Sequence, residues 1–182
     1  MKTTHIPALF GFVMLALVVG LELNQPPPTL LNPDPYAINS VDRELVRFHG
    51  LPVGAGKAAV RNAFGAPDRV YTDINDYIGN SEVWVFGRSE VSFHDDDGDY
   101  GTFRIKDARY PVKIGTLTLR VGESAAPLAT AFPISWRNRD SHRDTGNLWL
   151  RLSLTDSDAA LLSIEIDGDG KIVRIASDVI RV

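Results

Sequence analysis

Two stretches of this chain are versions of one pattern: residues 53–64 read VGAGKAAVRNAF, and residues 121–132 read VGESAAPLATAF. They align without a gap, and the matched residues are Val53 with Val121, Gly54 with Gly122, Val60 with Leu128, and Ala63-Phe64 with Ala131-Phe132. In both stretches small and apolar side chains recur at helical spacing, which predicts a short helix with a buried stripe in each. The match therefore predicts a structural unit that the chain uses twice.

The prolines near each stretch set the ends of the two predicted helices. The first helix should span about 55–64, because Pro67 cannot continue a helix. The second should span about 123–131, with Pro127 tolerated in its first turn and Pro133 ending it.

Alternating apolar and polar residues predict the strands of each unit. Residues 115–121 alternate ahead of the second helix, and by analogy residues 45–49 form the matching strand ahead of the first. Three strands follow each helix, at 82–86, 90–93 and 102–105 in the first half and at 148–154, 161–166 and 171–176 in the second. Residues 69–80 are expected to be irregular or a weak strand, and residues 135–146 a polar loop.

The predicted fold class is α+β, with two tandem units that each combine a short helix with a three- to four-stranded antiparallel sheet. The units span residues 41–107 and 108–182, behind a Pro-rich linker at 24–40 and an N-terminal segment at 1–23. Two such units side by side can share a larger sheet and core.

A run of residues in the first half resembles a family of the bacterial envelope. The run is Val53-Gly54, Val60, Phe64-Gly65 and Pro67-Asp68, followed by the strand around Trp84 and an Asp-Gly hairpin. It is similar to the SmpA/OmlA (BamE-like) domain, and tandem copies resemble the architecture of β-lactamase inhibitor proteins. The resemblance implies a small α+β fold, a role in outer-membrane protein assembly, or a concave sheet that grips a protein partner. The lipidated cysteine of the assembly lipoproteins is missing here, which favours the binding role.

Composition narrows the classes of function. The chain has 182 residues, of which 44% are hydrophobic and 23% charged, as in a folded globular protein. The formal net charge of -4 disfavours nucleic acid as a partner, because phosphate binding needs clustered cations. Cysteine is absent, so the chain can form no disulfide, thiolate zinc site or cysteine nucleophile.

The N-terminus has the pattern of an export segment. A short basic start precedes the apolar residues 6–21, and the first charge after them is Glu22. The run predicts a cleaved signal peptide or an uncleaved membrane anchor over residues 6–23, with a buried soluble helix as a third interpretation. Residues 24–35 are rich in proline and predict an extended spacer. The protein is therefore expected outside the cytoplasm, periplasmic or secreted, touching a membrane only through its N-terminal segment.

One cluster of carboxylates suggests a metal site. Asp95, Asp97 and Asp99 have the alternate spacing of a calcium-binding loop. Gly98 comes too early for that loop, however, and Lys106 stands where a bidentate glutamate is needed. A solvated hairpin tip is the competing interpretation, so calcium is the one cofactor that the sequence leaves open.

The sequence motifs do not predict catalysis. Gly54-Ala55-Gly56-Lys57 lacks the outer glycine and the Ser or Thr of a phosphate loop. Asp140-Ser141-His142 are neighbours in sequence, whereas the members of a catalytic triad meet across a fold. The chain is therefore expected not to be an enzyme.

Aromatic and cationic residues mark candidate contacts with a protein partner, because Trp and Arg are enriched at binding hot spots. The predicted polar loop carries four of them: Trp136, Arg137, Arg139 and Arg143. Trp84 and Trp149 are expected to pack on the sheet, and they become contacts if its outer face is open.

The predicted function is a non-catalytic, extracytoplasmic module of a bacterial envelope that binds an unidentified protein. It would act as an inhibitor or immunity protein, or as an accessory of envelope assembly. The alternative is an envelope protein that binds calcium or a small ligand.

Overall fold

The computed structural model describes residues 34, 36–75, 79–94, 101–155 and 160–179. The chain divides into two units, Met1–Asp34 and Pro35–Val182, and the second holds every described helix and strand. The predicted N-terminal segment, residues 1–23, lies outside the described residues. Among those that are described, no helix is long and apolar enough to span a membrane.

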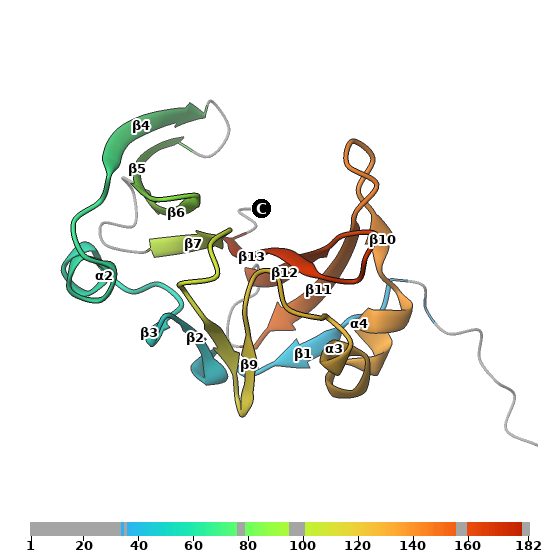
Figure 1. Ribbon diagram of the computed structural model, residues 1–182. Coiled ribbons are helices and arrows are strands. Elements are labelled where there is room, and N and C mark those ends of the chain that lie inside the picture. The colour runs from blue at the N-terminus through green and yellow to red at the C-terminus, as the bar shows by residue number, and fades with distance from the viewer. Residues whose placement is uncertain (1–33, 35, 76–78, 95–100, 156–159, 180–182) are drawn as a thin grey trace, which may run out of the picture. The chain divides into compact units, whose positions relative to one another are not determined.

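Strands are the main type of regular structure in the second unit (Figure 1). The strands are β1 (Asn39–Val41), β2 (Val46–Phe48), β3 (Leu51–Pro52), β4 (Arg69–Asn75), β5 (Gly79–Phe86), β6 (Ser89–His94), β7 (Gly101–Ile105), β8 (Val112–Ile114), β9 (Leu117–Leu119), β10 (Asp140–Ser141), β11 (Leu148–Leu154), β12 (Ala160–Ile166) and β13 (Ile172–Val179). The helices are the 3-10 helix η1 (Arg43–Leu45) and the α-helices α2 (Lys57–Phe64), α3 (Pro127–Ala131) and α4 (Pro133–Arg137).

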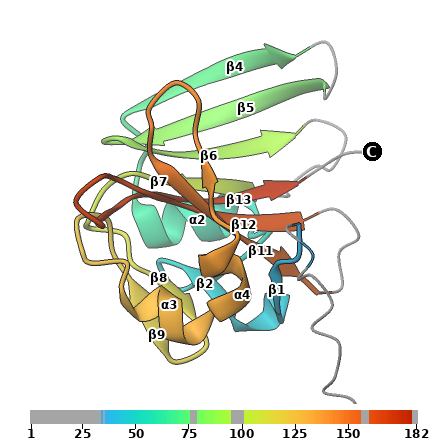
Figure 2. The same cartoon turned by 90° about the vertical axis from the view of Figure 1, so that its right-hand side faces the viewer.

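One mixed sheet of nine strands takes its strands from both halves of the chain (Figure 2). Its order is β1-β11-β12-β13-β7-β6-β5-β4, with β10 added to β11. Only β1 and β11 run parallel, and the other described pairs are antiparallel. The pair β7–β13 joins the halves, with Ile105 opposite Ile175 and Arg104 opposite Ala176.

A second sheet of four short strands has the order β3-β2-β8-β9. The turn between β2 and β3 is formed by His49 and Gly50, whose φ angles of 49° and 88° are both left-handed. Two consecutive left-handed residues suit the tight turn of a hairpin, because their twist matches that of the flanking strands.

The core lies between one face of the nine-stranded sheet and a layer formed by the four-stranded sheet and the helices (Figure 1). Phe103 of β7 stacks on Phe48 of β2, with ring centroids 4.7 Å apart. Phe64, the last residue of α2, packs against Phe86 of β5 at 5.1 Å. Leu128 of α3 is fully buried at the other end of the core. The large sheet contributes buried aliphatic residues from its central strands, including Leu150, Leu152, Ile164 and Ile175.

The predicted α+β class, with two tandem helix-plus-sheet units, is wrong. The described chain is mostly β-structure, and its α-helices have eight, five and five residues. The two halves of the chain share both sheets, because β7 pairs with β13 and β2 pairs with β8. Helices this short cannot cover the apolar face of a long sheet alone, so the four strands of the second sheet share this role with them (Figure 1).

The predicted strand 115–121 is too long, because the segment begins with a hairpin turn and only Leu117–Leu119 is a strand. Gly115 has a left-handed φ of 59°, a conformation that glycine adopts at little cost. The chain therefore reverses between Ile114, where β8 ends, and Leu117, where β9 begins. The alternation of Leu117 and Leu119 predicts a strand but does not show where the strand begins, so the turn before Leu117 was not predicted.

The helices of the second half, α3 and α4, both begin at a proline, and their bounds differ from the predicted ones. The helix predicted from residue 123 starts at Pro127, and Pro133 is the first residue of α4 rather than the end of a helix. A missing N–H is tolerated in the first turn, so proline can begin a helix as readily as it ends one. The predicted polar loop 135–146 is consequently part helix and part strand, with β10 inside it.

Residues 69–80, expected to be irregular or weakly β, include a regular strand. β4 pairs antiparallel with β5 at each of its seven residues, from Arg69 opposite Val85 to Asn75 opposite Gly79. Pairing with a neighbouring strand outweighs the low β-propensity of Asp and Asn here.

Candidate functional site

One face of the nine-stranded sheet, called the open face below, is covered by no described helix or strand (Figure 1). Side chains alternate between the two faces of a strand, so the register identifies those on each face. Core residues such as Phe103 and Ile175 mark the covered face. The open face is formed by the intervening positions, above all Tyr71, Glu90, Arg104, Arg174, Glu165, Trp149 and Arg151.

An aromatic ring and paired charges lie at the β4 end of the open face. Arg104 Nη1 is 3.0 Å from Glu90 Oε2. The guanidinium of Arg69 lies 5.0 Å from the ring centroid of Tyr71. Burial and the nearby Glu90 carboxylate raise the pKa of Tyr71, so its hydroxyl stays protonated at neutral pH and can donate a hydrogen bond.

Trp149 is the centre of a second group at the other end of the open face. Its ring centroid lies 4.7 Å from the guanidinium of Arg174 and 5.0 Å from the ring of His142. Arg174 Nε is 3.1 Å from Glu165 Oε2, and both side chains are largely buried. Asn147 donates a hydrogen bond of 2.8 Å to the same glutamate. These contacts hold the ring of Trp149 in one orientation.

A hollow borders Trp149 on the side of the hairpin β10–β11. Arg151 Nη2 is 2.6 Å from Asp140 Oδ2 within it. The residues that line it are Asp140, Ser141, His142, Arg143, Trp149 and Arg151. Cationic, acidic and aromatic groups are therefore available to a partner within one small area.

Small side chains separate the two groups. In register across the central strands, Arg104 lies beside Ala176, Ala176 beside Ser163, and Ser163 beside Arg151. Ala176 and Ser163 are 1% and 4% exposed. The open face thus has aromatic and arginine-rich groups on either side of a centre with short side chains. Tyr, Trp and Arg are the residues that most often dominate protein–protein binding energy.

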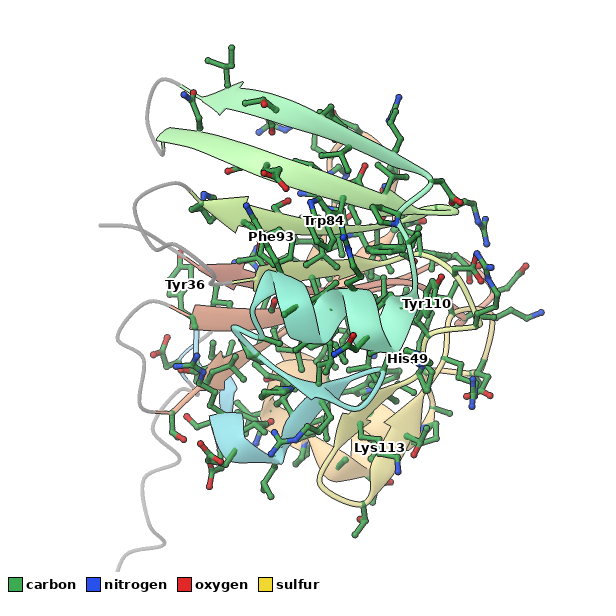
Figure 3. All side chains as sticks on the ribbon, turned by 90° about the vertical axis from the view of Figure 1, so that its left-hand side faces the viewer. Tyr36, His49, Trp84, Phe93, Tyr110 and Lys113 are labelled. Atoms are coloured by element: carbon green, nitrogen blue, oxygen red, sulfur yellow. The ribbon has the colours of Figure 1, made fainter. Side chains whose placement is uncertain are left out.

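Trp84 lies on the covered face of the sheet, unlike Trp149. It is 5% exposed, and its ring centroid is 5.1 Å from that of Phe93. Figure 3 shows both rings beside α2, and the guanidinium of Arg61 from that helix lies 5.2 Å from the Trp84 ring. The indole N–H of Trp84 donates to Glu82, which also pairs with Lys57 Nζ at 3.0 Å. The contacts of Trp84 are therefore those of a packed residue.

We expect Glu82→Gln to make stability less dependent on acid pH. The hydrogen bonds from Trp84 and Lys57 lower the pKa of the Glu82 carboxyl in the folded state. A lowered pKa stabilises the fold above the unfolded-state value, about 4.3 for glutamate, and this stabilisation is lost as the pH falls through the folded-state value. In urea titrations the variant should be less stable than the native protein at neutral pH and equal to it in strong acid.

The control for this experiment is Glu44→Gln, which changes an exposed carboxylate at η1. It should leave stability nearly unchanged at both pH values. A Glu82→Gln deficit that stays the same from neutral to acid pH would show that the two hydrogen bonds do not favour the ionised carboxylate.

The predicted cluster of Trp136, Arg137, Arg139 and Arg143 divides into three places. The guanidinium of Arg139 lies 3.5 Å from the ring centroid of Trp136, and burial lowers its pKa. Arg137 is exposed at the end of α4, and Arg143 is exposed in the hairpin between β10 and β11. Arg143 therefore shares its hollow with Trp149, while Trp136 and Arg139 form a stacked pair.

The predicted calcium ligands Asp95, Asp97 and Asp99 lie outside the described residues. His94, which precedes them, has its Nδ1 2.7 Å from Ser81 Oγ. Within the described part of the chain, no three His, Cys, Asp or Glu side chains gather as a metal site would require. Calcium binding stays a prediction.

The ion pairs of the open face escaped the sequence analysis, although the sequence contains a signal for them. In β11 the order Leu148-Trp149-Leu150-Arg151-Leu152 puts the leucines in one phase and Trp149 with Arg151 in the other. The same alternation separates Glu90 from Val91, and Arg104 from Phe103. Counting the phase of each strand would have assigned Trp149 to the polar face.

No protein-family model matches this chain, and the searches of characterised proteins and of solved structures returned no significant match either.

Proposed function

We propose that this chain is a non-catalytic protein-binding module of a bacterial envelope, and that its open face grips the partner. The observation that carries the proposal is the pairing of Tyr71 and Trp149 with arginines on a sheet face that no described element covers. Arg174 beside Trp149 is held by Glu165 in a largely buried pair, so binding there would immobilise few additional side chains.

The charge of the open face favours a protein over a polyanion. Arg104, Arg151 and Arg174 each lie within 3.1 Å of a carboxylate, so the local charge is balanced. Phosphate backbones require an excess of cations, whereas protein interfaces tolerate mixed charge around aromatic anchors. The partner would therefore be a folded protein with a complementary pattern of charge.

The place of action is proposed from the N-terminal sequence. A basic start followed by the apolar residues 6–21 favours export, and residues 24–35 would hold the module away from a membrane if the segment stays attached. An inhibitor or immunity protein and an accessory of envelope assembly both fit such a location.

Site-specific photo-cross-linking in intact cells tests this proposal. A photoreactive phenylalanine analogue at Arg104 or Arg151 places the probe on the open face. The matched control is Lys113, an exposed residue of β8 in the other sheet (Figure 3). We expect one adduct of the same mass from both open-face positions and none from Lys113.

Two results would contradict the proposal. Equal adducts from Lys113 and Arg104 would indicate contact without a preferred face. Adducts from Lys113 alone would put the partner on the four-stranded sheet.

A further inference from the structure

β4 is the last strand of the nine-stranded sheet, and one of its edges is unpaired among the described residues. Its other edge pairs with β5 along all seven residues, from Arg69 to Asn75, without a shift in register. Figure 2 shows no described helix or strand beyond it. An unpaired edge offers a row of backbone N–H and C=O groups, which makes it a template for another strand.

The side chains of β4 lack the features that usually protect such an edge. Val70, Tyr71 and Ile74 are 50%, 36% and 75% exposed. The strand has no proline or lysine and no bulge, and its charges are one Arg and one Asp. Edge strands normally avoid pairing through lysine, proline, bulges or inward charges. The edge of β4 is therefore suited to pairing.

The charges of β4 are self-complementary. Arg69 and Asp73 are each two residues from Tyr71, and all three side chains lie on the open face. If two copies of the strand pair antiparallel with Tyr71 opposite Tyr71, Arg69 of each copy lies opposite Asp73 of the other. Directly opposite residues on one face interact, and opposite charges there are favourable. Both ends of the pair would then be held by the same contact.

From this symmetry we infer that β4 forms an antiparallel strand pair with β4 of a second copy of the chain, centred on Tyr71. The two nine-stranded sheets continue into one another across a two-fold axis, and their open faces lie on the same side. An interface of one strand pair is small, so the dimer forms at high local protein concentration. A strand from an unrelated protein would share the backbone contacts but has no reason to share the Arg69–Asp73 pattern.

Cysteine cross-linking reads the register directly, because the native chain contains no cysteine. In the inferred dimer the two side chains of Tyr71→Cys face each other with Cβ atoms roughly 5 Å apart, close to disulfide range. Thr72→Cys is the matched control: it lies one residue along and points to the other face. Lys113→Cys controls for random collision.

Mild oxidation should convert Tyr71→Cys to a covalent dimer at least tenfold faster than either control. Faster coupling of Thr72→Cys would overturn pairing about Tyr71. Equal coupling of all three variants would overturn β4 as the interface. All substituted side chains are exposed, so unchanged melting temperatures should verify that the fold is retained.

Charge exchange provides an independent test by sedimentation velocity. Asp73→Arg places Arg69 opposite an arginine at both ends of the pair, and the dimer dissociation constant should rise roughly tenfold. The double variant Arg69→Asp, Asp73→Arg restores opposite charges and should return the constant to within about twofold of the native value. A native protein that stays monomeric at millimolar concentration, or a double variant as weak as the single one, would overturn the inference.

Discussion

Replacing Phe103 with alanine is expected to lower the free energy of unfolding by about 3–5 kcal/mol, the usual cost of deleting a buried phenylalanine side chain. Phe103 is 1% exposed and stacks on Phe48 with ring planes 6° apart. Its ring is also 6.2 Å from that of Phe64 on α2. One side chain thus contacts the nine-stranded sheet, the four-stranded sheet and a helix. A loss of this size would be a large part of the total stability of a typical domain.

Urea denaturation measures this loss, and the neighbouring residue supplies the control. Thr102 lies on the same strand but on the open face, and it is half-buried. Thr102→Ala should change the free energy of unfolding by less than about 1 kcal/mol. Equal losses for Thr102→Ala and Phe103→Ala would contradict the assignment of covered and open faces.

The positions of most strands in the large sheet could be predicted from the sequence. Strands predicted at 82–86, 90–93 and 102–105, and at 148–154 and 161–166, coincide with β5, β6, β7, β11 and β12. Their alternating apolar residues report a local property, namely that one face of each strand is buried. Such patterns predict strands well because a strand with alternating residues can bury all its apolar side chains in the core.

The pairing of those strands could not be predicted from the same patterns. No local sequence pattern predicts that Ile105 lies opposite Ile175, because both residues would be equally buried if the strands belonged to two separate sheets. The sequence allowed two adjacent units to share one sheet, but it did not show which strands would join them. The choice between one sheet and two depends on contacts about seventy residues apart, which periodicity does not record.

In the candidate site, too, some residue positions follow from the local sequence pattern, and others depend on the tertiary structure. The sequence predicts Trp84 and Trp149 together as candidate contacts, and the structure puts them on opposite faces of one sheet. The phase of the leucines around Trp149 contains this information, whereas Trp84 follows Val83, which is also buried. The pairing of Arg139 with Trp136 instead depends on α4, which the prediction had placed in a loop.

Trp149→Ala is expected to weaken binding of the cross-linked partner by about 30-fold or more, the effect of losing a hot-spot residue. Trp149 is held in place by Arg174 and His142, so a partner meets an ordered ring rather than a mobile one. Arg104→Glu should also weaken binding, because the new carboxylate would lie beside Glu90, which now pairs with Arg104.

The matched controls separate the open face from the rest of the surface. Trp136→Ala removes a half-buried tryptophan that stacks with Arg139, so it should lower stability with little effect on affinity. Lys113→Glu makes the same change of charge as Arg104→Glu, but in the four-stranded sheet. The melting temperature of each variant shows whether the protein being titrated is folded.

The dissociation constant of the partner for Trp149→Ala, measured by calorimetry beside Trp136→Ala, tests the role of the open face most directly. A loss of about 30-fold for the first variant and less than about threefold for the second is the expected result. Equal affinities for Trp149→Ala and the native protein, or a larger loss for Trp136→Ala, would contradict it.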